Sequence, residues 1–347
     1  MVNLPKLEDL DIEGKRVMVR GDLDVDVDKA KGNRSQVTGC HSRLKSLIPT
    51  LRYLHEHEAK KVIVIGHLGR PGGKVVEKLS LEPVSRMVEE MLKEEMSGEE
   101  MKKLDMHVME NLRFNPGEKE NDEEFAKQLA KQADVYVNEC FSTSHRKHAS
   151  FVALPQQFKS KSKNSVGIGI RFEKEMEELS RILDNPQKPV LAVISGIKGD
   201  KLSYVEPFLK FTDKVLVGGR LPEFVESNKL QVTSDKLVVA RLLPDKEDIT
   251  VHSIEEFENE IKSAGTIILS GPIGKYEEEG HRQGTERVFG AIVENKNAFK
   301  IAGGGDTESA IQLLKLTNGF NWISVGGGSM LEYLAKVTLP GIEALIN

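Results

Sequence analysis

Short β-branched runs that lead directly into glycine or polar residues most strongly constrain the fold of this chain. In chain order they are VMVRGD from residue 17, VIVIGHLGR from 62, DVYVNECFS from 134, PVLAVISGIKGD from 189, KVLVGGR from 214, TIILSGPIG from 266, FKIAGGGDTESA from 299 and WISVGGGSMLEYLA from 322. Charged segments with helical spacing lie between them, such as EEFAKQLAKQAD from 123. Continuous apolar strands that alternate with helices are typical of parallel sheets buried on both faces. The sequence therefore predicts an α/β protein with doubly wound parallel sheets, whose ligands bind at the carboxyl ends of the strands.

The length of 347 residues allows two domains of ordinary size. The segment RFEKEMEELSRILDNPQKP, which starts at residue 171, has apolar residues at helical spacing, and Asn185 and Pro186 should end that helix. We therefore expect an N-terminal domain at 1–170, a connecting helix at 171–188 and a C-terminal domain at 189–335.

The charge balance and composition exclude several classes of protein. A formal net charge of -5 argues against nucleic acid or an anionic membrane surface as the main partner. Two cysteines are too few for a disulfide framework, and the N-terminal residues lack the apolar core of a signal peptide. No run approaches the roughly 18 uninterrupted apolar residues of a membrane helix. We expect a cytoplasmic protein.

Four carboxylates occupy every second position of GDLDVDVD, at Asp22, Asp24, Asp26 and Asp28. Alternate residues of an extended chain point to the same face. Either all four carboxylates are exposed to solvent at the end of the strand, or some of them contact a ligand. A calcium-binding EF-hand loop that begins at Asp22 is excluded, because its sixth and twelfth positions hold Val27 and Asn33.

Three glycine clusters in the C-terminal half suggest a phosphate site: GGR from residue 218, GGGD from 303 and GGGS from 326. Glycine lets the backbone approach a phosphate, and a helix N-terminus offers free N–H groups, although each cluster alone also suits a tight turn. Ser329 and Glu332 have capping-box spacing, which predicts a helix start directly after the last cluster. No cluster is a Walker A sequence or a GxGxxG fingerprint, which argues against an NAD-dependent dehydrogenase.

Basic residues gather at the predicted turns of the N-terminal half. They are Arg43, His67, Arg70, Arg113, His145, Arg146 and His148. Each alone suits a solvated surface, but guanidinium groups at several strand ends suit a small, highly anionic ligand.

An ordered series of motifs then resembles the phosphoglycerate kinase family over almost the whole chain. The series comprises KRVMVRGDLDV, HLGRP, ENLRF, DVYVNECFSTSHRKHAS, SGIKGDK, GPIG, GGGDT and GGGSMLEYLAKVTLPGIEAL. The resemblance implies two Rossmann-like domains joined by a helix, with the tail at 336–347 returning to the N-terminal domain. It also implies 3-phosphoglycerate or 1,3-bisphosphoglycerate on the N-terminal domain, and ATP or ADP with Mg²⁺ on the C-terminal one.

Matched position by position, the resemblance implies a role for individual residues. The substrate site would comprise Asp22, Asp24, Arg43, His67, Arg70, Arg113 and Arg146. The nucleotide site would comprise Lys198, Lys201, Gly219, Glu277, Gly305, Asp306 and Thr307, with Asp306 as the Mg²⁺ ligand. The stabilisers of the transferred phosphoryl group would be Arg43, Lys198 and the N–H groups of Gly326, Gly327 and Gly328.

The implied activity is reversible phosphoryl transfer between 1,3-bisphosphoglycerate and ADP in glycolysis and gluconeogenesis, and hinge closure would bring the two substrates together. Two other readings stay open: a catalytically silent relative that binds nucleotide, and a kinase for another acyl phosphate. We expect a monomer.

The chain departs from the family pattern mainly on the nucleotide side. Ser270 stands where the family usually has asparagine, GIKGDK is one residue shorter than its counterpart, and Arg220 enters a stretch near the expected adenine. On the substrate side Asp24 replaces an asparagine and Glu139 an aspartate. We expect Asp24 to accept a hydrogen bond from the substrate hydroxyl, with arginines offsetting its charge, and Asp26 and Asp28 to be solvated.

Overall fold

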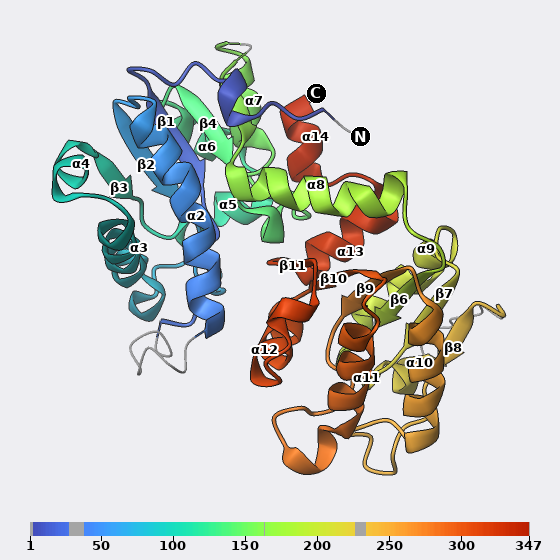
Figure 1. Cartoon of the computed structure of the whole chain (residues 1–347). Helices are drawn as coiled ribbons and strands as arrows, with labels where there is room; N and C mark the ends of the chain where they lie inside the picture. Colours follow the sequence, from blue (N-terminus) through green and yellow to red (C-terminus); the bar gives the residue numbers. More distant parts are fainter. Residues whose placement is uncertain (1–2, 28–37, 163, 226–233, 347) are drawn as a thin grey trace. The chain divides into compact units, whose positions relative to one another are not determined.

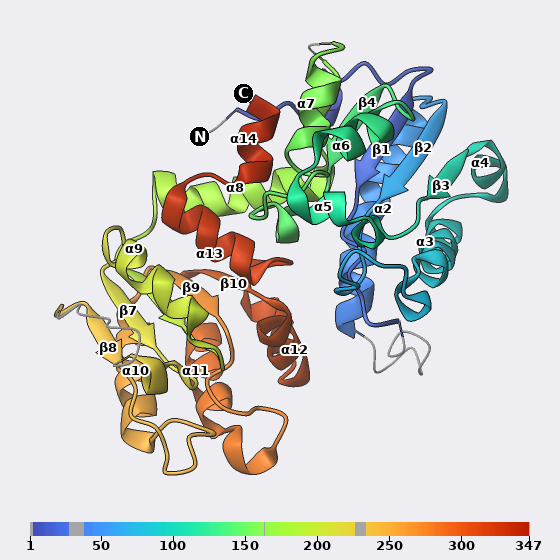
Figure 2. The same ribbon diagram turned by 180° about the vertical axis from the view of Figure 1, so that it is seen from behind.

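The chain forms two compact α/β units, seen from opposite sides in Figures 1 and 2. The computed structural model describes residues 3–27, 38–162, 164–225 and 234–346, so the predictions for Asp28 and Asn33 lie outside the described residues. The first unit runs to Glu177 and includes the segment from Thr338 to the C-terminus. The second unit is Glu178–Val337. The division falls within one helix, α8 (Ile170–Asp184).

The first unit is built on a five-stranded parallel sheet with strand order β3-β2-β1-β4-β5. Its strands are β1 (Arg16–Arg20), β2 (Lys61–Ile65), β3 (Met106–Val108), β4 (Val135–Asn138) and β5 (Val166–Ile168). Strand β1 is central, since Val19 pairs with Val64 of β2 and with Val137 of β4. The turns that follow β1 and β4 therefore start side by side at the same edge of the sheet.

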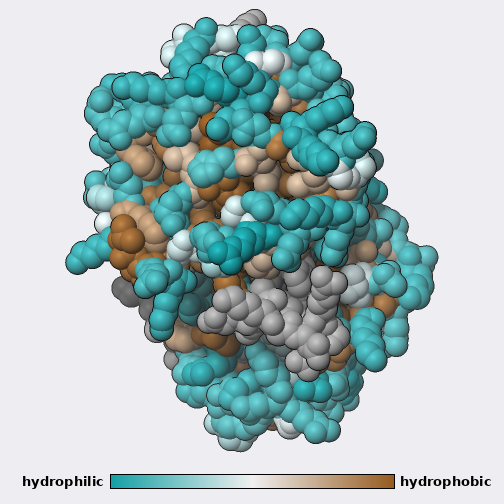
Figure 3. Space-filling model, turned by 90° about the vertical axis from the view of Figure 1, so that its left-hand side faces the viewer, coloured by the Kyte–Doolittle hydropathy of each residue, from teal (hydrophilic) through white to brown (hydrophobic). Residues whose placement is uncertain are grey.

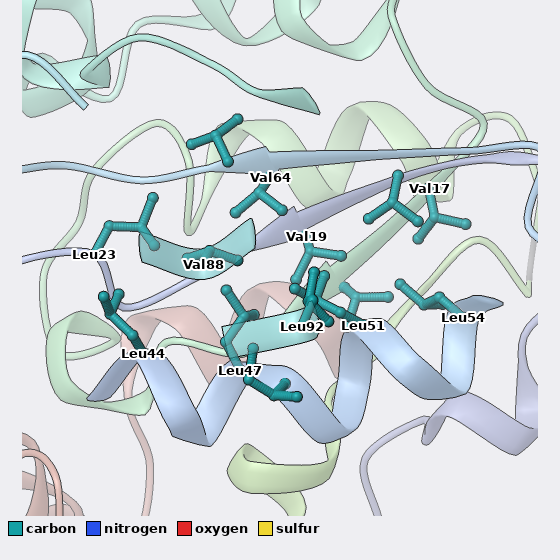
Figure 4. Packing of buried hydrophobic residues seen from close by; sticks show 14 of the residues in the cluster. Val17, Val19, Leu23, Leu44, Leu47, Leu51, Leu54, Val64, Val88 and Leu92 are labelled. Atoms are coloured by element: carbon teal, nitrogen blue, oxygen red, sulfur yellow. The ribbon is translucent and has the colours of Figure 1, made fainter. Parts of the chain in front are cut away.

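Helices cover both faces of this sheet. They are α2 (Thr38–Glu56), α3 (Glu82–Glu95), α4 (Gly98–Lys103), α5 (Pro116–Glu120), α6 (Glu123–Ala130), α7 (Ala153–Lys159) and α14 (Pro340–Ile346). Figure 4 shows Val17 and Val19 of β1 facing Leu47 and Leu51 of α2, and all four are buried. The opposite face carries Met18, which is also fully buried. Burial on both faces explains the uninterrupted apolar run that predicted β1.

The second unit repeats the architecture with a six-stranded parallel sheet of order β11-β10-β9-β6-β7-β8. Its strands are β6 (Val190–Ile194), β7 (Lys214–Val217), β8 (Leu237–Val239), β9 (Thr266–Ser270), β10 (Phe299–Gly303) and β11 (Trp322–Ser324). Its other helices are α9 (Val205–Leu209), α10 (Val251–Ser263), α11 (Gln283–Glu294), α12 (Gly305–Leu313) and α13 (Gly327–Lys336). The fold class predicted from the alternating pattern is confirmed in both units.

Short 3-10 helices form several of the connections. They are η1 (Leu7–Asp9), η2 (Glu77–Leu79), η3 (Leu112–Phe114), η4 (Phe141–Thr143), η5 (Gly199–Tyr204), η6 (Leu221–Phe224), η7 (Glu279–His281) and η8 (Thr317–Gly319). Two of them, η3 and η4, directly follow strands β3 and β4 at the edge where ligands are expected.

Polar and charged side chains dominate the face of the molecule shown in Figure 3, with smaller apolar patches between them. This distribution agrees with the 30% charged composition of the chain. Within the described ranges, no helix has both the length and the apolar character needed to cross a membrane.

Candidate functional site

The turns after β1 and β4 meet at the carboxyl edge of the first sheet. This is the point at which the chain order reverses in the strand order β3-β2-β1-β4-β5, where α/β sheets open a crevice. Ser142 in η4 donates a hydrogen bond of 2.7 Å to Oδ2 of Asp22, which follows β1. Oδ1 of Asp22 is buried without a hydrogen-bond partner, and Nη1 of Arg43 on α2 lies 3.7 Å from it. This sheet edge thus holds a buried acceptor oxygen, without a hydrogen-bond partner, beside a guanidinium group.

Asp24 is held by the turns around it. Its Oδ1 accepts a hydrogen bond of 2.8 Å from the N–H of Gly69, and its backbone carbonyl accepts one of 2.9 Å from Arg43. Its Oδ2 lies 3.6 Å from Nε2 of His67. Burial alone would raise the pKa of the Asp24 carboxyl, but the interaction with His67, the hydrogen bond from Gly69 and the charge of Arg43 outweigh burial and lower it. Asp24 is therefore ionised at neutral pH.

His67 is buried between Asp24 and an arginine that the sequence reasoning missed. Nη2 of Arg20, the last residue of β1, lies 2.8 Å from Nδ1 of His67. Burial lowers the pKa of His67 to about 4, even though Asp24 favours the protonated form. His67 therefore contributes a neutral imidazole to the site, whereas the arginines carry the positive charge.

The other predicted basic residues come from the turns after β2, β3 and β4. Arg113 in η3 donates a hydrogen bond of 2.8 Å to the carbonyl of Gly69, while Arg70 and Arg146 are exposed. Burial lowers the pKa of His148 to about 3, and the positive charges of Arg113 and Arg146 contribute to that shift. Helix α2, with Arg43, and the connections after β2, β3 and β4 thus bring cationic side chains to one edge of the first sheet.

Lys201 joins two strand ends at the carboxyl edge of the second sheet. Its ammonium donates hydrogen bonds of 2.7 Å to the carbonyl of Ser195, after β6, and of 3.3 and 3.2 Å to the carbonyl and hydroxyl of Ser270, the last residue of β9. Burial lowers the pKa of Lys201 to about 8, although the charges of Asp306 and Asp200 counteract the shift. Lys198, three residues earlier, is exposed. The two lysines predicted for the phosphates therefore occupy different environments.

The glycine turns after β10 and β11 pack backbone against backbone. A Cβ on Gly327 would lie 2.7 Å from the Cα of Gly304, which has φ +111°. Helices α12 and α13 begin directly after these turns, with Gly304 and Gly326 as their N-caps and no side-chain cap hydrogen bond at either. Two helix N-termini therefore lie next to each other, which is an arrangement suited to an anion.

Comparison with known proteins identifies the family. The family model described as phosphoglycerate kinase matches residues 7–238 and 223–336. The chain is 34% identical to the phosphoglycerate kinase of Dictyoglomus turgidum, over 98% of this chain and 97% of that protein. The chain belongs to the phosphoglycerate kinase family. It is also 32% identical to the phosphoglycerate kinase of Solibacter usitatus, over 98% of each chain.

Solved structures of the family have the same fold. The phosphoglycerate kinase of Coxiella burnetii superposes with a TM-score of 0.77 at 28% identity, over 99% of both chains. That of Pyrococcus horikoshii superposes with a TM-score of 0.78 at 27% identity, over 98% of both chains. The alignment with the Dictyoglomus protein spans 399 positions, which exceeds the 347 residues of this chain, so that relative carries segments that this member lacks.

The remaining predicted nucleotide residues lie around the turns of the second sheet in this phosphoglycerate kinase family member. Thr307 is buried, and its hydroxyl both donates to the carbonyl of Gly303 at 2.9 Å and accepts from the N–H of Gly271 at 2.8 Å. Burial raises the pKa of Tyr276 to about 12, and the charges of Glu277 and Asp306 add to the shift. Both carboxylates therefore lie near the Tyr276 hydroxyl. Gly305, Asp306 and Glu277 are exposed.

Gly219 and Arg220 form the turn after β7. Gly219 has φ +61°, and a Cβ there would lie 2.6 Å from the carbonyl oxygen of Gly196. Arg220 is paired with Glu223 at 3.1 Å and lies 3.8 Å from Glu247. Its guanidinium is therefore engaged by two carboxylates of its own unit.

The predicted capping box after the last glycine cluster is wrong. Helix α13 begins at Gly327, two residues before Ser329, because the glycines themselves form its cap and first turn. Glu332 instead accepts a hydrogen bond of 2.8 Å from the Tyr204 hydroxyl. This contact fixes α13 to the segment that follows β6.

Proposed function

We propose that this chain is an active phosphoglycerate kinase, which transfers a phosphoryl group reversibly between 1,3-bisphosphoglycerate and ADP to give 3-phosphoglycerate and ATP. The observation that carries the proposal is a cluster at one edge of the first sheet: the buried Oδ1 of Asp22, which has no hydrogen-bond partner, lies beside Arg43, and Arg113 and Arg146 lie near His148. In a chain that belongs to this family, such a cluster suits a ligand with a phosphate, a carboxylate and a hydroxyl group.

On the substrate side, Oδ1 of Asp22 would accept a hydrogen bond from the glycerate hydroxyl, since this oxygen lies near Arg43 but has no hydrogen-bond partner. Asp24 would assist as a second acceptor, although Gly69 already donates to its Oδ1. The phosphate and the carboxylate would be bound by the cationic and N–H-donating side chains of the same edge: Arg43, His67, Arg70, Arg113 and Arg146.

On the nucleotide side, the phosphates would bind at the adjoining N-termini of α12 and α13. Exposed Lys198 would reach them directly. Lys201 would act through its positive charge and by holding the ends of β6 and β9, because backbone and hydroxyl oxygens already accept hydrogen bonds from its ammonium. Thr307 would likewise support the turn through its two hydrogen bonds, and Gly219 would let the turn after β7 approach the nucleotide.

The carboxylates fit a Mg²⁺ ion that arrives with the nucleotide. Among the described residues, no three His, Cys, Asp or Glu side chains form a cluster that could hold a metal. Mg²⁺ is often bound by one or two carboxylates together with substrate phosphates, and exposed Asp306 in the first turn of α12 could supply one of them. When bound, the ion would offset the negative charge of the phosphates.

The protein would accelerate transfer mainly by positioning and charge neutralisation, because a loose phosphoryl transition state spreads negative charge over its oxygens. Arg43, Lys198 and the N–H groups of Gly326, Gly327 and Gly328 would face that charge. Since the two substrates bind to separate units, the units must close around them and expel water before transfer. We further propose that the protein works as a cytoplasmic monomer without nucleic acid or membrane partners.

A turnover assay tests the proposal. Purified protein with Mg-ATP and 3-phosphoglycerate should form 1,3-bisphosphoglycerate, which is detected with a coupled dehydrogenase that reduces it. The protein should act much more slowly on 3-hydroxypropanoate phosphate, which differs from 3-phosphoglycerate only in lacking the 2-hydroxyl. Binding of Mg-ADP without any turnover would support the silent-relative reading. Faster turnover with a different carboxylate would support a kinase for another acyl phosphate.

A further inference from the structure

A buried chain of hydrogen bonds leads from Glu118 to His67 beneath the substrate edge of the first unit. The Ser150 hydroxyl donates to Oε1 of Glu118 at 2.7 Å, and Nε of Arg20 donates to the Ser150 hydroxyl at 3.0 Å. Nη2 of Arg20 then lies 2.8 Å from Nδ1 of His67. All four residues are buried, and the exposed fraction of Arg20 is 0%.

The position of Arg20 leaves it no freedom to change these partners. Its Nη1 donates to the carbonyl of Gly21 at 2.5 Å, and its guanidinium lies 4.5 Å from the centre of the Phe151 ring. Glu118 also accepts a hydrogen bond of 3.0 Å from the N–H of Ser150, which fixes the far end of the chain. The donors and acceptors in the series are therefore fixed from Glu118 to the imidazole.

A guanidinium group can only donate hydrogen bonds, so Nδ1 of His67 must accept from Arg20. The imidazole proton consequently resides on Nε2, which faces Oδ2 of Asp24 at 3.6 Å. Protonation of His67 would place an N–H against the N–H of Arg20. Rotation of the ring by 180° would place a C–H there instead and forfeit the hydrogen bond.

We propose that Arg20 is a positioning residue that holds His67 as the neutral tautomer with its proton on Nε2. The nitrogen that faces Asp24 is then always an N–H donor, which an anionic substrate oxygen bound beside Asp24 can share. The identity of that oxygen, on 3-phosphoglycerate, rests on the proposed function. The opposite tautomer would present a lone pair to the same oxygen and repel it. Arg20 thus determines whether His67 offers the ligand an N–H or a lone pair, although Arg20 itself does not contact the ligand.

The charged groups around His67 shift its pKa in opposite directions. Arg20 on β1 and Arg113 in η3 disfavour the imidazolium, and Asp24 in the turn after β1 favours it. His148 is also close enough for His67 to influence its pKa. Because burial and the two arginines prevail, the neutral form should persist throughout the physiological pH range.

Nitrogen NMR of the histidines in the free protein tests the inference without any substrate. In wild-type protein, the His67 signals, assigned with His67→Gln, should show a protonated Nε2 and an unprotonated Nδ1 from pH 5.5 to 8. A proton on Nδ1, or titration of His67 near pH 6.5, would overturn the proposal. This result does not depend on turnover, so an inactive protein with the expected tautomer would contradict the proposed function alone.

Two variants then connect the tautomer to binding. Arg20→Met should allow His67 to exchange tautomers and should raise the KM for 3-phosphoglycerate about tenfold, the usual effect of one hydrogen bond to a charged group, with a smaller change in kcat. Arg16→Met is the matched control, because Arg16 lies on the same strand but pairs with Asp134. If Arg20→Met is folded and keeps the wild-type His67 signals, Arg20 does not set the tautomer. If Arg16→Met alters those signals equally, the effect is a general one of strand β1.

Discussion

At the scale of single residues, the sequence pointed to exposed and half-buried cations but not to the buried Arg20, Glu118 and Ser150. Exposed Arg70 and Arg146 and half-buried Arg113 lie in the connections that follow strands, and half-buried Arg43 lies on α2. Arg20 instead ends an apolar strand and is fully buried. Its partner Ser150 and the Glu118 that accepts from Ser150 lie about a hundred residues away or more along the chain, so only the folded structure brings them together.

The effect of Asp24 on substrate affinity is one prediction at this scale. Asp24→Asn should lower the KM for 3-phosphoglycerate severalfold and leave kcat nearly unchanged, because a carboxylate close to an anionic ligand repels it. The control is Asp26→Asn, since Asp26 is exposed two residues further on. Steady-state kinetics at constant ionic strength measures both variants. An unchanged or higher KM for Asp24→Asn would mean that the carboxylate does not face the ligand anion.

The pH dependence of stability is a second prediction. The pKa of His67 is about 4 in the folded chain and about 6.5 when unfolded. Above pH 6.5 the group is neutral in both states, but as the pH falls the unfolded chain binds a proton and the folded chain does not. His67 should thus reduce the free energy of unfolding between pH 6.5 and 4, by about 3 kcal/mol in total.

Urea unfolding at several pH values measures this effect. His67→Gln should flatten the decline, whereas the control His107→Gln, at an exposed position, should keep the wild-type slope. An equal slope in wild type and His67→Gln would show that His67 is already free to protonate when folded.

At the scale of elements, the sequence predicted the central strands and missed three short ones. Strands β3, β5 and β8 have three residues each and lie at sheet edges. An edge strand has one neighbour, so it needs neither a long apolar run nor burial on both faces, and β8 is only half-buried. Strand β11 is equally short and also lies at an edge, but the sequence predicted it because the apolar run WISV is followed by three glycines.

The glycine turns give a prediction for these elements. Gly327→Ala should lower the free energy of unfolding of the second unit by about 1–3 kcal/mol and weaken Mg-ADP binding, because the new Cβ would lie 2.7 Å from the backbone of Gly304. In the control Gly290→Ala, no atom lies within 4 Å of the new Cβ, and helix α11 should gain up to about 1 kcal/mol. Thermal unfolding and calorimetry measure both. Equal stability of the two variants would contradict the close approach of the turns.

At the scale of the whole molecule, the alternating pattern predicted two parallel-sheet units, and the order of the motifs identified the family. The limits proposed for the domains and the roles of individual residues stay predictions. Lys201 shows why sequence alone could not assign such roles, since its place in GIKGDK suggested a phosphate contact while its ammonium binds strand-end carbonyls. The spacing of residues in a sequence does not show which backbone or side-chain acceptors will surround a lysine once the chain has folded.

We propose that one cation from each unit, Arg43 and Lys198, stabilises the transferred phosphoryl group, and kcat measured together with substrate binding tests this role directly. Arg43→Ala and Lys198→Ala should each lower kcat by about 10²-fold or more. In calorimetry, Arg43→Ala should weaken only 3-phosphoglycerate and Lys198→Ala only Mg-ADP. Arg86→Ala and Lys262→Ala, at exposed positions on α3 and α10, are the matched controls and should keep wild-type kcat. Wild-type kcat in either Arg43→Ala or Lys198→Ala would contradict the claim.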